Sequence, residues 1–307
     1  MVAGRRAGQG EAALLGNPPT APHASTVWRT ERGPLDLDRP RIAGILNATP
    51  DSFFDGGRHQ GVDRGLARAE AMLEQGADLL DLGGESTRPG ARPVALEQEL
   101  ERILPLLREF VRRWPTVPVS IDTVKSGVAR AALAEGAAAI NDVSGLRLDP
   151  ALGEAVAEAG AGLVLMHSRG DVARMASYDD AVYGDDPVAE IVAELDTALA
   201  RARGAGVDAT SIVLDPGLGF SKRTAHSVAV LAHLDRLATL GRPILVGPSR
   251  KRFIGELGGG ATPDDRLAGT IAACVLALAG GARLFRVHDV GETRRALDVA
   301  AGILEAR

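Results

Sequence analysis

The chain has 307 residues, of which 45% are hydrophobic, 24% charged and only 3% aromatic, and its formal net charge is −5. This composition is typical of a soluble globular protein, and so small a negative charge argues against binding to nucleic acid or to an anionic membrane. Cys274 is the single cysteine, which excludes an intrachain disulfide, and its apolar neighbours predict that it is buried. No apolar run approaches the roughly 20 residues that span a bilayer, and no signal peptide is recognisable. We expect a cytoplasmic protein that acts on small molecules, with no nucleic-acid or membrane partner.

The N-terminal part of the chain changes character near residue 27. Residues 1–26 are rich in Ala, Gly, Pro and Thr without a sustained period, and we predict a disordered extension there. Two short strands are expected at 27–30 and 35–37, because Gly33 and Pro34 between them supply turn chemistry. Such a strand pair can cap the sheet or barrel that follows, so we expect one domain over 27–307.

From Ile42 onward a short apolar run, a loop and a longer segment with helical periodicity recur eight times. The apolar runs are 42–46, 79–82, 117–121, 138–140, 163–166, 212–214, 244–246 and 284–287. The helical segments are expected at 63–75, 96–113, 125–135, 150–159, 187–205, 226–240, 263–279 and 292–305. A kink is expected at Pro105 in the second of them. Eight strands that read as buried on both faces favour a closed parallel (β/α)8 barrel, the TIM barrel of the α/β class, over a doubly wound open sheet.

Polar side chains follow nearly every apolar run, at the face of a barrel where active sites lie. They are Asn47, Gly83-Gly84-Glu85, Asp122, Asn141-Asp142, His167, Asp215, Ser249-Arg250-Lys251, Arg286 and His288. Asp122, Asn141 and Asp215 suit a heterocycle that bears amide and amine groups, whereas Arg88, Lys251, Arg286 and His288 suit phosphate. Taken singly, the first three are equally well explained as helix caps or turn residues. Their joint placement predicts a binding site.

The pattern excludes some cofactors and favours another. No cluster of His, Cys and Glu indicates zinc. A Mg²⁺ ion needs few protein ligands when a diphosphate supplies oxygens, and Asn47 is a candidate ligand. The glycine-rich runs 55–57 and 258–260 match neither a P-loop nor a dinucleotide fingerprint, so we interpret them as loops. His167 and His226 are interpreted as packing or loop residues, not as catalysts.

With these residues in view, the sequence resembles the dihydropteroate synthases, a family of pterin-binding barrel enzymes. The resemblance covers Trp28 to the C-terminus and rests on seven motifs in order, at 44–57, 83–90, 120–123, 141–145, 215–220, 249–251 and 286–290. It implies a transferase of folate biosynthesis that condenses 6-hydroxymethyl-7,8-dihydropterin diphosphate with p-aminobenzoate to give 7,8-dihydropteroate and diphosphate. It also implies Mg²⁺ as the cofactor and a homodimer, to which the apolar, small-residue segment 268–279 is suited.

The resemblance also implies a role for each site residue. The pterin ligands would be Asp122, Asn141, Asp215 and Lys251, and the Mg²⁺ ligand Asn47. The anion site would comprise Thr87, Arg88, Arg286 and His288, with Val287 as a further substrate contact. The aminobenzoate pocket would comprise Phe53, Pro89, Phe220 and Arg252, the last standing where many members of the family have Ser. The catalytic residues would be Lys251, Arg88 and Asp55.

Two other functions compete with this one. A methyltetrahydrofolate-dependent methyltransferase shares the pterin-binding barrel but has no need for Arg88, Lys251 or the pair of Arg286 and His288. A non-catalytic pterin-binding paralogue predicts damaged loops, yet the motifs at 51–57 and 87–89 are intact. Both are therefore less favoured than the synthase.

Overall fold

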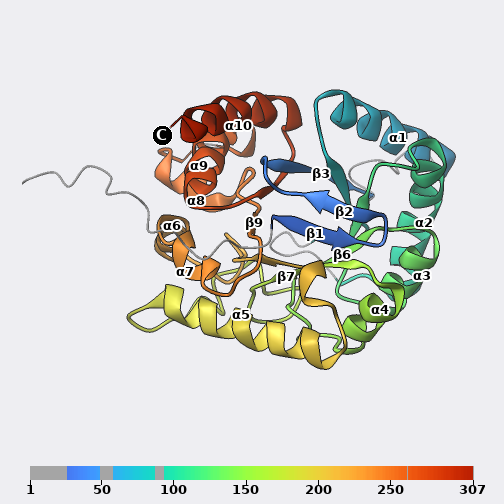
Figure 1. Ribbon diagram of the computed structural model, residues 1–307, viewed down its shortest axis with the longest axis horizontal. Coiled ribbons are helices and arrows are strands. Elements are labelled where there is room, and N and C mark those ends of the chain that lie inside the picture. The colour runs from blue at the N-terminus through green and yellow to red at the C-terminus, as the bar shows by residue number, and fades with distance from the viewer. Residues whose placement is uncertain (1–25, 49–57, 87–92, 261, 307) are drawn as a thin grey trace, which may run out of the picture.

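The computed structural model describes residues 26–48, 58–86, 93–260 and 262–306. The predicted extension, apart from Thr26, and the predicted loop 55–57 lie outside these residues. Within them the strands occupy the centre, and the helices surround them in chain order from α1 through α5 to α10 (Figure 1). The chain therefore has the α/β architecture that the repeating pattern predicts.

Eight parallel strands form the central sheet. They are β3 (Arg41–Asn47), β4 (Leu79–Gly83), β5 (Val119–Asp122), β6 (Ala139–Asp142), β7 (Gly162–Met166), β8 (Ile212–Asp215), β9 (Leu245–Val246) and β10 (Leu284–Val287). Their order is β8-β7-β6-β5-β4-β3-β10-β9. A parallel bridge from Leu214 to Ile244 joins the two edges, and the N–H of Leu214 donates to the carbonyl of Pro243 at 2.9 Å. The prediction of a closed parallel barrel is confirmed.

The helices agree with the expected segments, with four differences, the first being that α1 begins five residues before the expected start at 63. The helices are α1 (Arg58–Glu74), α2 (Leu96–Arg113), α3 (Ser126–Ala134), α4 (Ala151–Ala159), α5 (Pro187–Gly204), α6 (Thr224–Ala232), α7 (Leu234–Ala238), α8 (Arg252–Leu257), α9 (Leu267–Ala279) and α10 (Val290–Glu305). The segment expected at 226–240 divides into α6 and α7 because His233 leaves helical geometry, with φ −131° and ψ 42°. The segment expected at 263–279 begins as a 3-10 turn, Pro263–Arg266. Helix α8 has only six residues, too few for a periodic signal. Pro105 lies inside α2, which continues through it.

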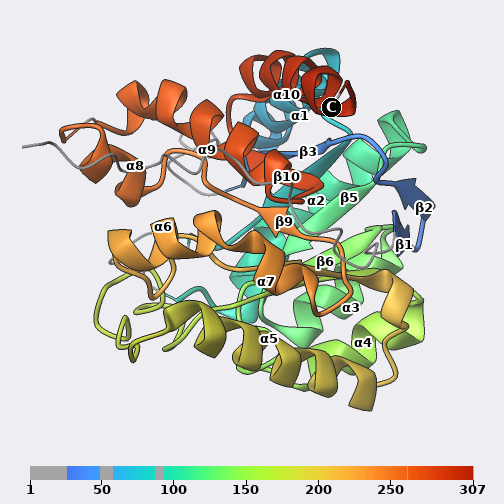
Figure 2. The same cartoon turned by 60° about the vertical axis from the view of Figure 1, so that its left-hand side comes forward.

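The amino ends of the strands are closed by the predicted strand pair, β1 (Val27–Thr30) and β2 (Gly33–Asp36), which is antiparallel (Figure 2). The turn lies at residues 31–32, so the expectation that Gly33 and Pro34 form it is wrong: both belong to β2 and pair with Thr30 and Arg29. Trp28 is fully buried, and its Nε1 donates to the carbonyl of Ser211 at 2.8 Å. Its ring has room because Gly162 has no side chain: a Cβ there would lie 2.8 Å from the indole. Trp28 and Leu37 pack against the residues that fill this end of the barrel, Ala43, Leu79, Ala139, Val164, Val213, Leu245 and Leu284. The expectation that the strand pair caps the barrel is confirmed.

Other apolar side chains fill the space between the strands and the helices, including Ile42, Leu80, Phe110, Leu195 and Phe285. Cys274 lies in this core with no exposed surface, and burial raises the pKa of its thiol to about 12. The prediction that it is buried is confirmed. None of the described helices is both long and apolar enough to cross a membrane.

Candidate active site

Four strands send polar side chains to one place inside the barrel. Asp81 of β4 accepts a hydrogen bond from Arg286 Nε on β10 at 2.5 Å and one from Asn141 Nδ2 on β6 at 3.1 Å. Its other oxygen accepts from the hydroxyl of Ser120 on β5 at 2.5 Å. Arg286 Nη2 donates to Asp122 Oδ2, at the end of β5, at 2.8 Å. These bonds join β4, β5, β6 and β10 into one ionic network.

Asp81 was missed by the sequence analysis, which placed it within the apolar run 79–82. Its side chain is almost fully buried, and it is the partner that Arg286 and Asn141 share. A signal was present, because a carboxylate within a two-face-buried strand needs a partner to offset its desolvation. The sequence alone did not show that this partner lies at the far end of the chain.

Burial changes the acidity of both predicted acidic pterin ligands. It raises the pKa of Asp122 to about 7, against the opposing effect of the Arg286 charge and with the help of the Asp81 carboxylate. It raises the pKa of Asp215 to about 6, although the Gly217 N–H, which donates to Asp215 Oδ1 at 2.7 Å, works in the opposite direction. Both groups can therefore change their charge near neutral pH.

Lys251 lies between β9 and α8, and its position depends on the residue before it. Arg250 has φ +57°, a left-handed conformation that is costly for a residue other than glycine. It is held there by two bonds to Asp289, at 2.7 and 3.0 Å, and by a bond from its N–H to Thr270 at 3.1 Å. The resulting turn places Lys251 Nζ 3.7 Å from the centre of the Phe220 ring. Burial, with the nearby Arg286, lowers the pKa of Lys251 to about 7.

Arg286 lies on β10, and His288 follows two residues later, just beyond the end of this strand. The bonds of Arg286 to Asp81 and Asp122 use its Nε and Nη2, which leaves Nη1 to meet an anion. Burial, and then the charge of Arg286, lower the pKa of His288 to about 3, so its imidazole is neutral. Ser249 Oγ accepts the His288 N–H at 3.1 Å and lies 3.0 Å from its Nδ1. When the serine hydroxyl donates to Nδ1, the proton is on Nε2, and the imidazole offers one N–H donor.

The other predicted site residues occupy different surroundings. Asn47 ends β3, and a Cβ added at Gly83 would lie 3.7 Å from its Oδ1 and 3.8 Å from Asp122 Oδ2, so both oxygens face the gap that this glycine leaves. Val287 has its side chain fully buried in the apolar core, so only its backbone can meet a substrate. Phe220 is buried beside Lys251.

Arg252 points to an aromatic ring. Its guanidinium lies 3.4 Å from the centre of the Tyr178 ring, and its Nε is 3.8 Å from Glu256. Its role at the aminobenzoate carboxylate stays a prediction. Five further predicted residues lie outside the described part of the chain, and their roles stay predictions too: Phe53, Asp55, Thr87, Arg88 and Pro89.

A second ionic cluster borders the segment that holds three of those residues. Glu85 Oε1 accepts the N–H of Val94 at 2.5 Å, and its Oε2 accepts from Lys125 Nζ at 2.9 Å. Lys125 also donates to the fully buried Glu99 at 2.5 Å. Glu85 therefore joins the two ends of the segment 87–92 to each other and to the start of α3. The sequence analysis did not single out these contacts.

Comparisons with known proteins agree with this geometry. The family model described as pterin binding enzyme matches residues 43–288. Dihydropteroate synthase of Mycobacterium leprae is 46% identical over 277 residues, which cover 89% of this chain and 96% of that protein. A structure of Xanthomonas albilineans dihydropteroate synthase with 4-aminobenzoic acid aligns with a TM-score of 0.81 at 48% identity, covering 88% of this chain and 95% of that one. The Burkholderia cenocepacia enzyme complexed with 7,8-dihydropteroate aligns with a TM-score of 0.82 at 42% identity, covering 93% and 99%.

Proposed function

The chain belongs to the pterin-binding enzymes and, within them, to the dihydropteroate synthases, and from this premise we propose how its own residues carry out the reaction. The enzyme is a transferase that joins 6-hydroxymethyl-7,8-dihydropterin diphosphate to p-aminobenzoate and releases diphosphate. The observation that carries the proposal is the convergence of Asp122, Asn141, Asp215 and Lys251 at the carboxyl end of one barrel. Relatives with the same fold have been solved with 4-aminobenzoic acid and with 7,8-dihydropteroate.

The polar groups of the site match the edges of a pterin. The ring carries an N–H and an amino group side by side, and a buried carboxylate such as Asp215 accepts hydrogen bonds from both. The carbonyl oxygen and ring nitrogen acceptors of the pterin suit the ammonium of Lys251. Asn141 uses its Nδ2 for Asp81, which leaves its Oδ1 as an acceptor for the substrate. The pocket is preformed, because these residues sit on barrel strands or directly beyond them.

The reaction replaces a C–O bond by a C–N bond at the pterin methylene. The diphosphate leaves with the electron pair of the C–O bond, and the aniline nitrogen of p-aminobenzoate attacks the carbon and then loses a proton. Arg286 Nη1 and the Nε2–H of His288 donate to the departing oxygens, where negative charge develops. The aniline is already nucleophilic as the free amine, so the protein does not need a strong base.

We also propose Mg²⁺ as the metal that accompanies the diphosphate, with Asn47 as its protein ligand. The fit rests on the donor: an amide oxygen is a hard ligand, and Asn47 Oδ1 faces the gap beside Gly83. The described residues contain no group of three His, Cys, Asp or Glu side chains that could hold a metal. This donor set suits an ion that takes most of its ligands from substrate oxygens and water. When bound, Mg²⁺ would neutralise part of the diphosphate charge.

A homodimer is the assembly we propose. A groove of about 600 Å³ runs between α9 and α10 and is lined mainly by Ile271, Val275, Ala296, Val299, Ala300 and Ile303. Leu276 is 67% exposed, Val299 65% and Ile303 57% on the same two helices, and exposed apolar side chains gathered on one face are typical of an interface. Sedimentation of the purified protein measures the assembly directly. A cytoplasmic location stays a prediction from the sequence.

The activity is tested by measuring diphosphate release from the pterin diphosphate with and without p-aminobenzoate. We expect release to require Mg²⁺ and the aminobenzoate, with 7,8-dihydropteroate formed in equal amount. Methyl transfer from methyltetrahydrofolate in place of this reaction would identify the alternative enzyme. Binding of the pterin without turnover in either assay would identify the non-catalytic paralogue.

A further inference from the structure

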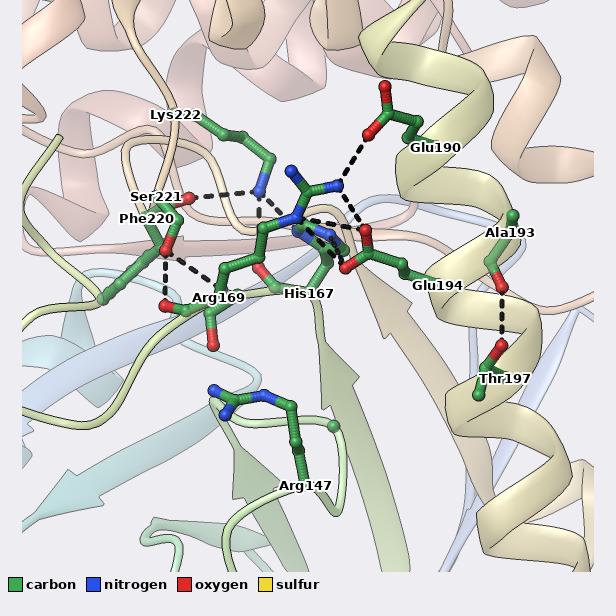
Figure 3. A network of polar contacts seen from close by, with 12 residues as sticks. Arg147, His167, Arg169, Glu190, Ala193, Glu194, Thr197, Phe220, Ser221 and Lys222 are labelled. Carbon is green, nitrogen blue, oxygen red and sulfur yellow. Dashed lines mark hydrogen bonds and ion pairs between the residues drawn. The ribbon is translucent and has the colours of Figure 1, made fainter. Parts of the chain in front are cut away.

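A lysine that the proposed mechanism does not use is buried behind the pterin site. Lys222 follows β8 by seven residues and is 1% exposed (Figure 3). Its Nζ donates to the carbonyl of Phe220 at 3.1 Å, contacts the carbonyl of His167 at 3.4 Å and lies 2.7 Å from His167 Nδ1. These three acceptors match the three protons of an ammonium. Burying a charged lysine among neutral acceptors costs free energy, so the placement of Lys222 needs an explanation.

His167 connects this ammonium to a carboxylate. As an ammonium Lys222 can only donate, so His167 Nδ1 accepts and the proton of the imidazole lies on Nε2, 3.0 Å from Glu194 Oε2. Burial, followed by the charge of Lys222, lowers the pKa of His167 to about 4, which keeps the imidazole neutral. Glu194 also pairs with Arg169, whose Nε lies 3.1 Å from Glu194 Oε1. A neutral imidazole therefore stands between a buried ammonium and an anion at the protein surface.

The residue before Lys222 locks the same loop. Ser221 has φ +46°, a left-handed conformation that a serine keeps only where its surroundings determine it. Its N–H donates to the carbonyl of Met175 at 2.6 Å, and its hydroxyl donates to the carbonyl of Arg169 at 2.7 Å. The N–H of Arg169 donates back to the serine oxygen at 2.9 Å. The loop after β8 is thus fastened to the loop after β7, with Phe220 on one side of Ser221 and Lys222 on the other.

The fastened loop carries a predicted pterin ligand. The N–H of His167 donates to the carbonyl of Asp215 at 2.9 Å. Gly217 has φ +68°, and a Cβ there would collide with the carbonyl of His167, which Lys222 also contacts. The Lys222 ammonium therefore contacts the same carbonyl against which the turn at Gly217 packs, and the Gly217 N–H orients the Asp215 carboxylate.

We infer that Lys222 is a positioning residue for pterin binding, because it holds the loop 215–220 through His167 and Phe220. Its positive charge also favours the ionised form of the Asp215 carboxyl. An ionised carboxyl accepts the N–H bonds of the pterin, whereas a protonated one competes with them. This inference rests on the proposed function. The charges that act on Asp215 are Lys222, Lys251 and Arg286, and those that act on Lys222 are Asp215, Glu194, Arg169 and Lys251. Burial lowers the pKa of Lys222 to about 7, so the ammonium keeps its proton near pH 6, where Asp215 changes its charge.

The test follows binding of 6-hydroxymethylpterin by calorimetry over about pH 5–8. This alcohol lacks the diphosphate, so no titration of the anion enters. We expect wild-type affinity to fall as pH drops through the pKa of Asp215, about 6, and this fall is the acid limb of the pH profile. In Lys222→Gln the amide still donates to the Phe220 carbonyl but the charge is gone, and the acid limb should move up by about half to one pH unit. Lys222→Arg keeps the charge and should keep the limb in place, even where its bulk lowers affinity at every pH.

The matched control is Arg223→Gln, which removes an exposed cation from the neighbouring residue and should leave the limb unmoved. Glu194→Gln provides a variant that will fold, because this side chain is 42% exposed. This substitution removes the negative charge that stabilises the Lys222 ammonium. The acid limb should therefore move up, but by less than in Lys222→Gln. A limb within about 0.2 pH of wild type in Lys222→Gln, or an equal loss of affinity at every pH, overturns the inference. Wild-type protein that does not bind the pterin at all would instead refute the proposed function.

Discussion

The two ends of the barrel differ sharply although the same strands build both. At the amino end the inward side chains are apolar and Trp28 covers them, whereas two residues further along four of the strands they are ionic or amide. The change occurs within roughly 7 Å, the rise of two strand residues. The pairs that show it are Leu79 and Asp81, Ala139 and Asn141, Val213 and Asp215, and Leu284 and Arg286. The apolar layer therefore supplies stability and a rigid base, and the layer above it holds the side chains that can bind a substrate.

The largest effect is expected from Asp81→Ala, because Asp81 contributes both to stability and to the binding site. The variant leaves the buried guanidinium of Arg286 with Asp122 alone and removes the acceptor of Asn141. Breaking a buried pair typically costs about 3–5 kcal/mol, so we expect a loss of this order in the free energy of unfolding, together with loss of pterin binding. Urea denaturation and calorimetry measure the two. Wild-type stability would show that Asp81 does not hold the guanidinium.

Trp28→Ala should affect stability alone. The variant opens a cavity at the amino end and removes the bond to Ser211, which typically costs about 3–5 kcal/mol. At temperatures where the protein stays folded, KM for both substrates should be unchanged. The control is Trp114→Ala, since this ring is only partly buried at the end of α2 and should cost less. A raised KM in Trp28→Ala would show that the two ends are not separable.

Lys251→Ala should have the opposite signature. It removes a charged hydrogen-bond donor from the site, worth about 1.5–3 kcal/mol, so kcat/KM should fall roughly ten- to hundredfold. The free energy of unfolding should not fall, since the pKa of Lys251 is lowered and burial of its charge opposes folding. Steady-state kinetics within about twofold of wild type would refute the role of this lysine.

The pH dependence of pterin affinity should reflect two groups of the site, one acidic and one basic. Asp215 must be ionised, with a pKa raised to about 6, and Lys251 must be protonated, with a pKa lowered to about 7. Affinity for 6-hydroxymethylpterin should therefore fall below pH 6 and again above pH 7. In Lys251→Arg the guanidinium keeps its proton, so the fall in affinity above pH 7 should become smaller. The part that remains is expected from Lys222, whose pKa is also lowered to about 7. An unchanged fall in this variant would refute the role of Lys251.

The smallest effect is expected from removing residues 1–25. Nothing in that stretch has the periodicity of a packed element, so activity and melting temperature should stay unchanged. Thr26 should be kept, because its carbonyl accepts the N–H of Leu37 at 2.6 Å. Scanning calorimetry of the shortened chain is the measurement. A lowered melting temperature would place the extension against the capped end of the barrel.

Much of the fold could be predicted because its signals are local. The alternation of short apolar runs with helical periodicity predicted eight units, and each central strand lies within two residues of its expected bounds. The polar residues at the strand ends predicted where a site would form, since parallel strands bring those ends together. Short elements such as α8 were missed, because six residues carry no period.

Local signals in the sequence are enough to specify the barrel, its cap and the set of polar residues at the carboxyl end. Which of these residues meet depends on the tertiary structure: Arg286 pairs with Asp81 across 205 residues of chain, and Lys222 contacts His167 across 55. The physical reason is that periodicity depends on neighbours a few residues apart, whereas the satisfaction of a buried charge depends on distant strands. A carboxylate or an ammonium inside an apolar run signals that a partner is needed. Closure of the barrel supplies that partner.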